Sequence, residues 1–145
     1  MHITKDEIEP QAFGDHEGRT TTASYAVCTV DELPQLWEGA VKLVRVGLGI
    51  SAFGANILDL PPNYTTESHD EADTGQQELY VALRGSGRVL IGDQGLIIDE
   101  EHLVRVDAGV SRVLASGEEG LRVLCVGSTP DAPYSPPAWS RGGGG

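Results

Sequence analysis

The sequence is poor in basic residues and in long apolar stretches, and each shortage excludes a class of partner. Its 145 residues include 10 Lys and Arg against 22 Asp and Glu, which gives a formal net charge of -12. A surface of this sign repels phosphate backbones, so we expect no nucleic-acid partner. No apolar run approaches the ~20 residues that a membrane-spanning helix needs, so we expect no membrane partner either.

Cysteine is scarce as well. The two cysteines, Cys28 and Cys125, lie far apart in separate strand-like runs. Without a C-x-x-C spacing they indicate buried thiols rather than a disulfide framework or a zinc site. The first ten residues contain no apolar signal region, which predicts a cytoplasmic protein.

Turn-forming residues, in contrast, are abundant. The chain has 19 Gly and 8 Pro, and valine and leucine recur in short runs, as is typical of a fold made of many short strands. We expect one domain over residues 24–128, which is long enough to bury a core. The polar residues 1–23 predict a flexible arm. The Pro-rich and Gly-rich residues 129–145 predict a flexible tail, part of which Tyr134 and Trp139 would pin to the domain.

Short alternating runs predict the strands, and no long helical pattern interrupts them. Asp31 is a favourable N-cap for a short helix over residues 31–37, and Trp37 at its end is expected to pack against the domain. Turns are expected at residues 85–87, 92–95, 107–109 and 116–120. The expected strands are residues 25–30, 41–51, 53–60, 78–83, 88–91, 96–98, 102–106, 111–114 and 121–126. This pattern predicts an all-β sandwich or small barrel.

Most of the chemistry lies in one stretch, residues 60–87. A di-proline turn leads into an acid-rich loop that contains His69 and ends at Glu78, where an alternating apolar run begins. The period of two places Glu78, Tyr80 and Ala82 on one face of a strand. The loop therefore predicts a site at the mouth of this strand.

The same stretch resembles the first signature motif of the cupin superfamily. That motif reads Gly, five residues, His-x-His, three or four residues, Glu, six residues, Gly. Here Asn63 holds the first Gly position, His69 follows after five intervening residues, and Glu71 holds the second His position. Glu78 then follows after a slightly longer gap, and Gly85 follows Glu78 after six intervening residues.

A later stretch resembles the second cupin motif in its spacing. That motif reads Gly, five residues, Pro-x-Gly, two residues, His, three residues, Asn. Glu101 holds the first Gly position and Asp107 the Pro position, whereas Gly109 is retained. Arg112 stands where the third His would be, and Ser116 where the Asn would be.

The resemblance covers residues 41–128 and implies a cupin-type jelly-roll β-barrel of six to eight strands, often assembled as a homodimer. With the short helix expected at residues 31–37, the predicted fold is such a barrel with a short N-terminal helix. Members of the superfamily include metal-dependent dioxygenases, isomerases and decarboxylases as well as storage proteins and regulators. The resemblance therefore predicts the fold but not the activity, and whether the chain is an enzyme stays open.

A metal site is one interpretation of the altered motifs. A cupin site uses three imidazoles and one carboxylate, which suit Fe, Mn, Ni or Zn. Here His69, Glu71 and Glu78 would be the ligands, with Asp73 as an alternative carboxylate. Arg112 has no lone pair and would repel a divalent ion. The cofactor is thus either one divalent transition metal, in a dioxygenase or isomerase, or none.

The second interpretation uses the same residues without a metal. Arg112 would point into the barrel and pair with Glu78, because a buried carboxylate needs a partner. The pair is either structural or leaves one guanidinium edge to bind a ligand carboxylate or phosphate. His69 is either a hydrogen-bonded loop residue or a ligand contact or general base that an acid orients. Tyr80 either packs in the core or reaches the ligand.

We therefore predict a cupin that binds a small polar or anionic molecule inside the barrel. The predicted ligand-binding residues are His69, Glu71, Glu78, Tyr80 and Arg112. The metal-dependent enzyme is the alternative, and an interaction or storage module without site chemistry is a third.

Overall fold

The computed structural model describes residues 24–140. The arm predicted at residues 1–23 and the last five residues of the predicted tail lie outside this range. Their flexibility stays a prediction. No helix within residues 24–140 is long and apolar enough to cross a bilayer.

The described residues form one seven-stranded antiparallel sheet with a few short helical segments, which confirms the all-β class. Strand order is β1-β2-β3-β7-β4-β5, and β6 pairs with β4. The strands are β1 (Gln35–Leu36), β2 (Val41–Leu43), β3 (Gly54–Leu60), β4 (Gln77–Ile91), β5 (Gln94–Ile98), β6 (Val104–Val106) and β7 (Val113–Ser128). The helical segments are α2 (Val44–Leu48), η2 (Val30–Glu32), η3 (Trp37–Gly39) and η4 (Ala138–Ser140).

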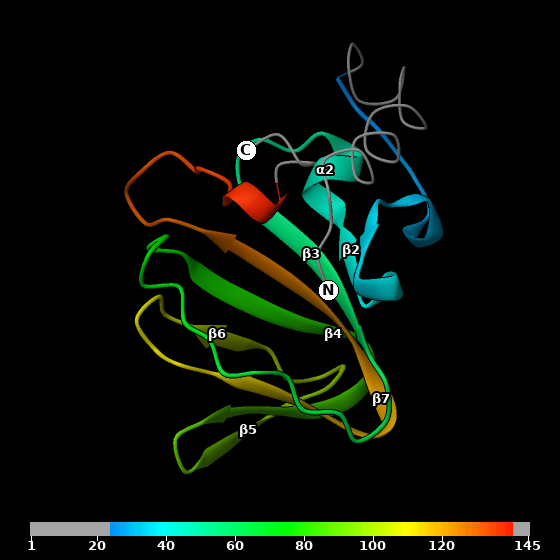
Figure 1. The fold of residues 1–145 in the computed structure, drawn as a ribbon, viewed down its shortest axis with the longest axis vertical. Helices are drawn as coiled ribbons and strands as arrows, with labels where there is room; N and C mark the ends of the chain where they lie inside the picture. The colour runs from blue at the N-terminus through cyan, green and yellow to red at the C-terminus, as the bar shows by residue number, and fades with distance from the viewer. Residues whose placement is uncertain (1–23, 141–145) are drawn as a thin grey trace.

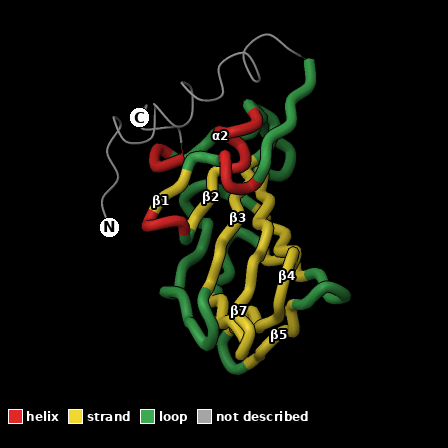
Figure 2. Tube along the Cα trace, turned by 90° about the vertical axis from the view of Figure 1, so that its right-hand side faces the viewer, coloured by secondary structure: helices red, strands yellow, loops and turns green. Residues whose placement is uncertain are grey.

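Two long strands, β4 and β7, form the centre of the sheet and pair with each other over most of their length. In Figure 1 they run across the molecule, with β2, β3 and α2 at one side and β5 at the other. Figure 2 shows the helical segments gathered at one end, away from β5. The core lies on the inner face of these strands, where Tyr80, Ala82, Leu114, Val123 and their neighbours are buried.

The turn predicted at residues 85–87 is wrong, because β4 continues through it. The pairing with β7 shifts register twice there, which marks an irregular, bulged ladder. A Cβ atom on Gly85 would lie 2.2 Å from the carbonyl oxygen of Gly120, and one on Gly87 would lie 2.2 Å from that of Ala115. The two glycines therefore allow close approach of the neighbouring backbone and do not reverse the chain.

The turn predicted at residues 116–120 is wrong for a related reason. β7 is one 16-residue strand in which the strands predicted at 111–114 and 121–126 are joined. Gly120 has φ +81°, which lets the strand bend while its pairing with β4 continues on both sides.

The N-terminal part of the domain differs most from expectation. The strand predicted at residues 25–30 is absent, and the side chains of Tyr25 and Val27 are largely exposed. The helix predicted over 31–37 is a single 3-10 turn, η2, whose N-cap is Thr29 rather than Asp31. Thr29 and Glu32 form a capping box, with each side chain accepting a hydrogen bond from the other's backbone N–H.

The strand predicted over residues 41–51 ends early, because the helix α2 replaces its second half. α2 ends at Gly49, whose φ of +73° is the left-handed conformation that closes many helices. Gly47 lets the helix pack tightly, since a Cβ there would lie 2.5 Å from Cδ2 of Leu33. Packing therefore overrides the strand preference of the valines at 44 and 46.

Other predictions are confirmed. β3 matches the strand expected at residues 53–60, and β4 and β5 form the expected hairpin around the turn at Gly92 and Asp93. β6 covers only the last part of the strand expected at 102–106. Cys125 is buried and Cys28 partly buried, and no disulfide joins them within the described chain.

The described part of the tail folds back onto the domain. Trp139 packs against Trp37 with ring centroids 6.3 Å apart, and the guanidinium of Arg45 donates a hydrogen bond to the carbonyl oxygen of Ser140. Residues 138–140 form the 3-10 turn η4, although the sequence predicted no helix in the tail. The expected contact of Trp139 with the domain is thus present, whereas the packing of Trp37 against the barrel wall stays a prediction.

Candidate functional site

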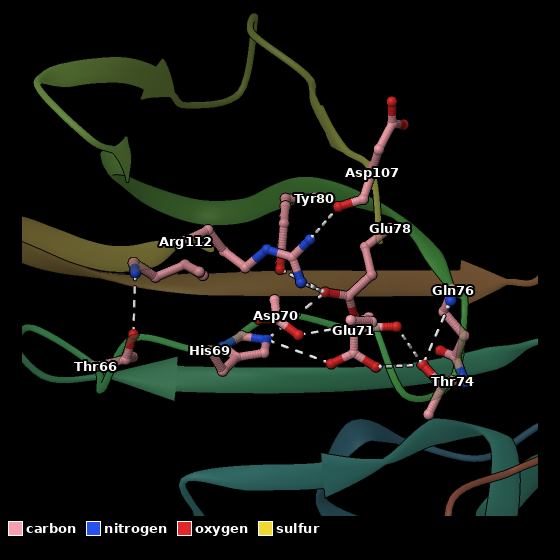
Figure 3. Close-up of polar contacts among 12 residues, drawn as sticks. Thr66, His69, Asp70, Glu71, Thr74, Gln76, Glu78, Tyr80, Asp107 and Arg112 are labelled. Carbon is pink, nitrogen blue, oxygen red and sulfur yellow. Dashed lines mark hydrogen bonds and ion pairs between the residues drawn. The ribbon is translucent and has the colours of Figure 1, made fainter. Parts of the chain in front are cut away.

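A pocket of about 630 Å³ opens on the inner face of β3, β4 and β7. Among the predicted site residues, His69, Glu71, Glu78 and Tyr80 line it. Figure 3 shows these side chains and Arg112 pointing toward one another. The structure thus brings together the residues that the two motifs place far apart in the sequence.

His69 reaches the pocket because its loop pairs with the segment that carries Arg112. The backbone N–H of His69 donates to the carbonyl of Arg112 at 3.1 Å, and the N–H of Arg112 donates to the carbonyl of His69 at 2.9 Å. This two-residue antiparallel bridge ties the first motif to the second. The side chain of His69 remains 46% exposed, at the mouth of the pocket.

Arg112 is fully buried, and the predicted pairing with Glu78 is present. Its Nη1 donates to Oε1 of Glu78 at 3.2 Å, and its Nη2 donates to the backbone carbonyl of Asp107 at 2.8 Å. Its Nε is buried with no partner within the described chain. Arg112 does not line the pocket. Both of its terminal nitrogens bond the protein, so the guanidinium group is not presented to a ligand.

Tyr80 and Glu78 form a short hydrogen bond on this wall. The Tyr80 hydroxyl donates to Oε1 of Glu78 at 2.6 Å. Burial and the neighbouring carboxylate raise the pKa of Tyr80 far above its ordinary value, so the phenol stays neutral and donates. Burial alone would raise the pKa of Glu78, but nearby His69, the Tyr80 hydroxyl and the Arg112 charge together lower it. Glu78 is therefore an ionised carboxylate at neutral pH.

Glu71 stands opposite Glu78, whereas Asp73 does not join the cluster. Oε1 of Glu71 accepts from the Thr74 hydroxyl at 3.0 Å, and Oε2 lies 3.6 Å from Nε2 of His69. Asp73 is exposed and is not among the residues that line the pocket. The predicted alternative in which Asp73 replaces a histidine ligand has no geometric support.

The donor set can be tested for a metal ion. Ligand atoms of His69, Glu71 and Glu78 lie within 4.8 Å of one another, close enough to approach one ion. However, they include a single imidazole, and Oε1 of Glu78 already accepts from Tyr80 and Arg112. A permanent cation 3.2 Å from that oxygen would repel a divalent ion. These residues therefore do not fit a cupin metal centre well.

The sequence did not single out Gln76, which also lines the pocket. Its side chain is buried near the Tyr134 hydroxyl, and Nε2 makes no hydrogen bond of normal geometry within the described chain. The period of two that places Glu78 and Tyr80 on the inner face could have identified Gln76, since it lies two residues before Glu78. His102, in contrast, lies outside the pocket and bonds Asp99 across a 2.7 Å contact.

Comparisons with known proteins agree on the fold. No family model and no curated protein matches the sequence. A cupin from Bacteroides fragilis superposes with a TM-score of 0.62 at 14% identity, over 80% of this chain and 93% of that one. The chain has the cupin fold.

Two further solved structures support this conclusion. A double-stranded β-helix protein from Klebsiella pneumoniae gives a TM-score of 0.57 at 14% identity, over 76% of this chain and 97% of its own. An RmlC-like cupin from Desulfovibrio desulfuricans gives 0.52 at 14% identity, over 74% and 93%. The likeness at this identity concerns the cupin fold alone, so function must be argued from the pocket.

Proposed function

We propose that this cupin-fold protein binds a small polar organic molecule in the barrel pocket, through side chains and without a metal ion. One observation carries the proposal. The pocket is lined by Gln76, whose buried Nε2 has no hydrogen-bond partner within the described chain, and by Glu78, whose Oε1 alone accepts the hydrogen bonds of Tyr80 and Arg112. Buried polar groups are normally hydrogen-bonded. A ligand that offers both an acceptor and a donor would satisfy them.

The pocket's size supports a small molecule. A volume of about 630 Å³ falls within the roughly 300–1,000 Å³ of typical ligand sites. Its wall also combines apolar and aromatic side chains with a few polar groups, the usual mixture in such sites. The polar ligand of the sequence prediction is better supported than the anionic one, because Arg112 does not line the pocket and its terminal nitrogens already bond Glu78 and Asp107.

A screen by ligand-observed NMR tests the proposal. We expect fragments from a mixed library of neutral, cationic and anionic compounds to bind the wild-type protein and to lose affinity in Glu78→Gln. Glu119→Gln, which removes an exposed charge outside the pocket, is the matched control. If no fragment binds the wild-type protein more tightly than it binds Glu78→Gln, the proposal is contradicted, and an interaction or storage module is favoured.

The metal-dependent enzyme is the second candidate, because His69, Glu71 and Glu78 do converge. Metal analysis of protein purified without a His-tag separates it from the first. Near-stoichiometric Fe, Mn, Ni or Zn, lost in His69→Ala, would favour the enzyme. The homodimer, the cytoplasmic location and the exclusion of nucleic acid and membranes remain predictions.

A further inference from the structure

The aromatic residues of this chain are concentrated around the pocket. Both tryptophans and three of the four tyrosines line it. Trp37 and Trp139 form one part of the wall at 6.3 Å between ring centroids, with an interplanar angle of 42°. An aromatic wall favours an apolar or aromatic body, and its negative faces also attract organic cations.

The charged side chains of the wall also favour a cationic ligand. The carboxylates of Glu67, Glu71 and Glu78 line the pocket, against the guanidinium of Arg45 and the buried Arg112 behind the wall. Arg45 already donates to a backbone carbonyl of the tail. Summed over these five groups, the formal charge is negative, within a chain of net charge -12. Such a field concentrates cations and repels anions.

The unsatisfied groups specify two further features of the ligand. Glu71 and Glu78 are ready acceptors, so they call for a donor, and a charged donor makes the stronger hydrogen bond. The side-chain amide of Gln76 is 6% exposed, and its unpartnered Nε2 calls for an acceptor oxygen. One molecule of the size of this pocket can carry both groups.

We propose that the molecule bound in this pocket is a small protonated amine that has an apolar or aromatic body and an acceptor oxygen. This inference rests on the proposed function and narrows its ligand class. The ammonium group lies between Oε2 of Glu71 and Oε2 of Glu78, the oxygens that do not accept from Thr74, Tyr80 or Arg112, and the acceptor oxygen faces the amide of Gln76. The body packs along the wall that contains Trp37 and Trp139.

Three compounds of nearly equal size test the inference by isothermal titration calorimetry on the untagged full chain. Tyramine carries an ammonium group, tyrosol a neutral hydroxyl and 4-hydroxyphenylacetate a carboxylate. We expect tyramine to bind about tenfold more tightly than tyrosol, because a charge-assisted hydrogen bond replaces a neutral one. The acid is expected to bind most weakly of the three.

Variants locate the ammonium group. Glu71→Gln should weaken tyramine binding by about tenfold and tyrosol binding by about twofold or less, because it removes the charge and keeps the shape. Glu118→Gln removes an exposed charge outside the pocket and should change neither. Trp139→Ala, on the partly exposed tail, should weaken all three compounds alike.

The outcomes separate this inference from the proposed function. If tyrosol or the acid binds as tightly as tyramine, the inference that the ligand is a protonated amine is wrong, while the pocket remains a ligand site. The same holds if none of the three binds although fragments from the NMR screen do. If Glu71→Gln leaves the affinity for tyramine unchanged, the placement of the ammonium group beside Glu71 is wrong. If no fragment binds at all, the proposed function itself fails.

Discussion

Two charged clusters on opposite faces of the sheet differ in how completely their carboxylates are satisfied. Asp59 accepts from Nε of Arg122 on one oxygen, at 2.7 Å, and from Nζ of Lys42 on the other, at 2.7 Å. Glu78 instead accepts from Tyr80 and Arg112 on one oxygen, and no hydrogen bond to its other oxygen is present within residues 24–140. The comparison separates a closed ion cluster that stabilises the fold from an open one that faces a pocket.

Among the variants that test this comparison, Arg112→Met should have the largest effect. It leaves the largely buried carboxylate of Glu78 without its charged partner, and we expect a loss of about 3 kcal/mol in the free energy of unfolding. Denaturant unfolding followed by tryptophan fluorescence measures it. Arg105→Met removes a guanidinium that is 69% exposed and should cost about 0.5 kcal/mol or less. A loss for Arg112→Met as small as that of the control would show that the pair is not structural.

Asp59→Asn and Glu78→Gln sharpen the contrast between the clusters. Asp59→Asn leaves Lys42, which is almost fully buried, without a carboxylate, and should cost about 2 kcal/mol of stability. It should not change ligand affinity. Glu78→Gln should lower ligand affinity by about tenfold, because the ligand loses a charged acceptor. Equal effects of the two variants on ligand affinity would erase the proposed distinction.

Acid should reduce the contribution of both clusters to the free energy of unfolding. Burial raises the pKa of Asp59, but Arg122 and Lys42 outweigh it, so the pKa is lowered, as it is for Glu78. A lowered pKa contributes stability that is complete above the unfolded-state value, about 4, and is lost as the pH falls through the folded-state value. We expect a steady free energy of unfolding from pH 7 to about 5 and a decline below about 4.

The variants provide the check on this pH profile. In Asp59→Asn and in Glu78→Gln the decline below about pH 4 should be shallower than in the wild type, since one linked group is gone. Denaturation series at several pH values measure the slope. Profiles parallel to the wild type would mean that these carboxylates are not the linked groups.

The smallest expected effect is that of Tyr80→Phe. It removes the 2.6 Å hydrogen bond to Glu78 and should cost about 1 kcal/mol of stability. Ligand affinity should fall only a few-fold. Tyr25→Phe, at a tyrosine that is 85% exposed, is the control and should be neutral. A neutral Tyr80→Phe would show that the phenol does not support Glu78.

The sequence predicted the inner face of β4 because strand alternation depends little on context. The period of two placed Glu78, Tyr80 and Ala82 together, and the motif spacing placed Arg112 opposite them. The cupin fold followed from the same motifs. The functional roles of these residues remain predictions, since no ligand tests them.

Other features depended on neighbours that a sequence does not reveal. A pair of glycines looks the same in a turn and in a bulged strand, and only the backbone of β7 beside Gly85 and Gly87 distinguishes them. Likewise, α2 forms among β-branched residues because Gly47 packs on Leu33, a contact between segments. Gln76 went unnoticed because it lies before the predicted start of the strand at residue 78, so the alternation was not extended back to it.

The folded-back tail has a consequence for how molecules enter the barrel. Tyr134 and Trp139 are part of the pocket wall, and the tail is held there by the Trp37 ring and by Arg45. A ligand that enters between Trp37 and Trp139 would have to displace the tail, which would return to its place when the ligand leaves. Truncation after residue 128 would remove Tyr134 and Trp139 from this wall, so we expect it to speed both the entry and the release of a bound molecule as well as to weaken its binding.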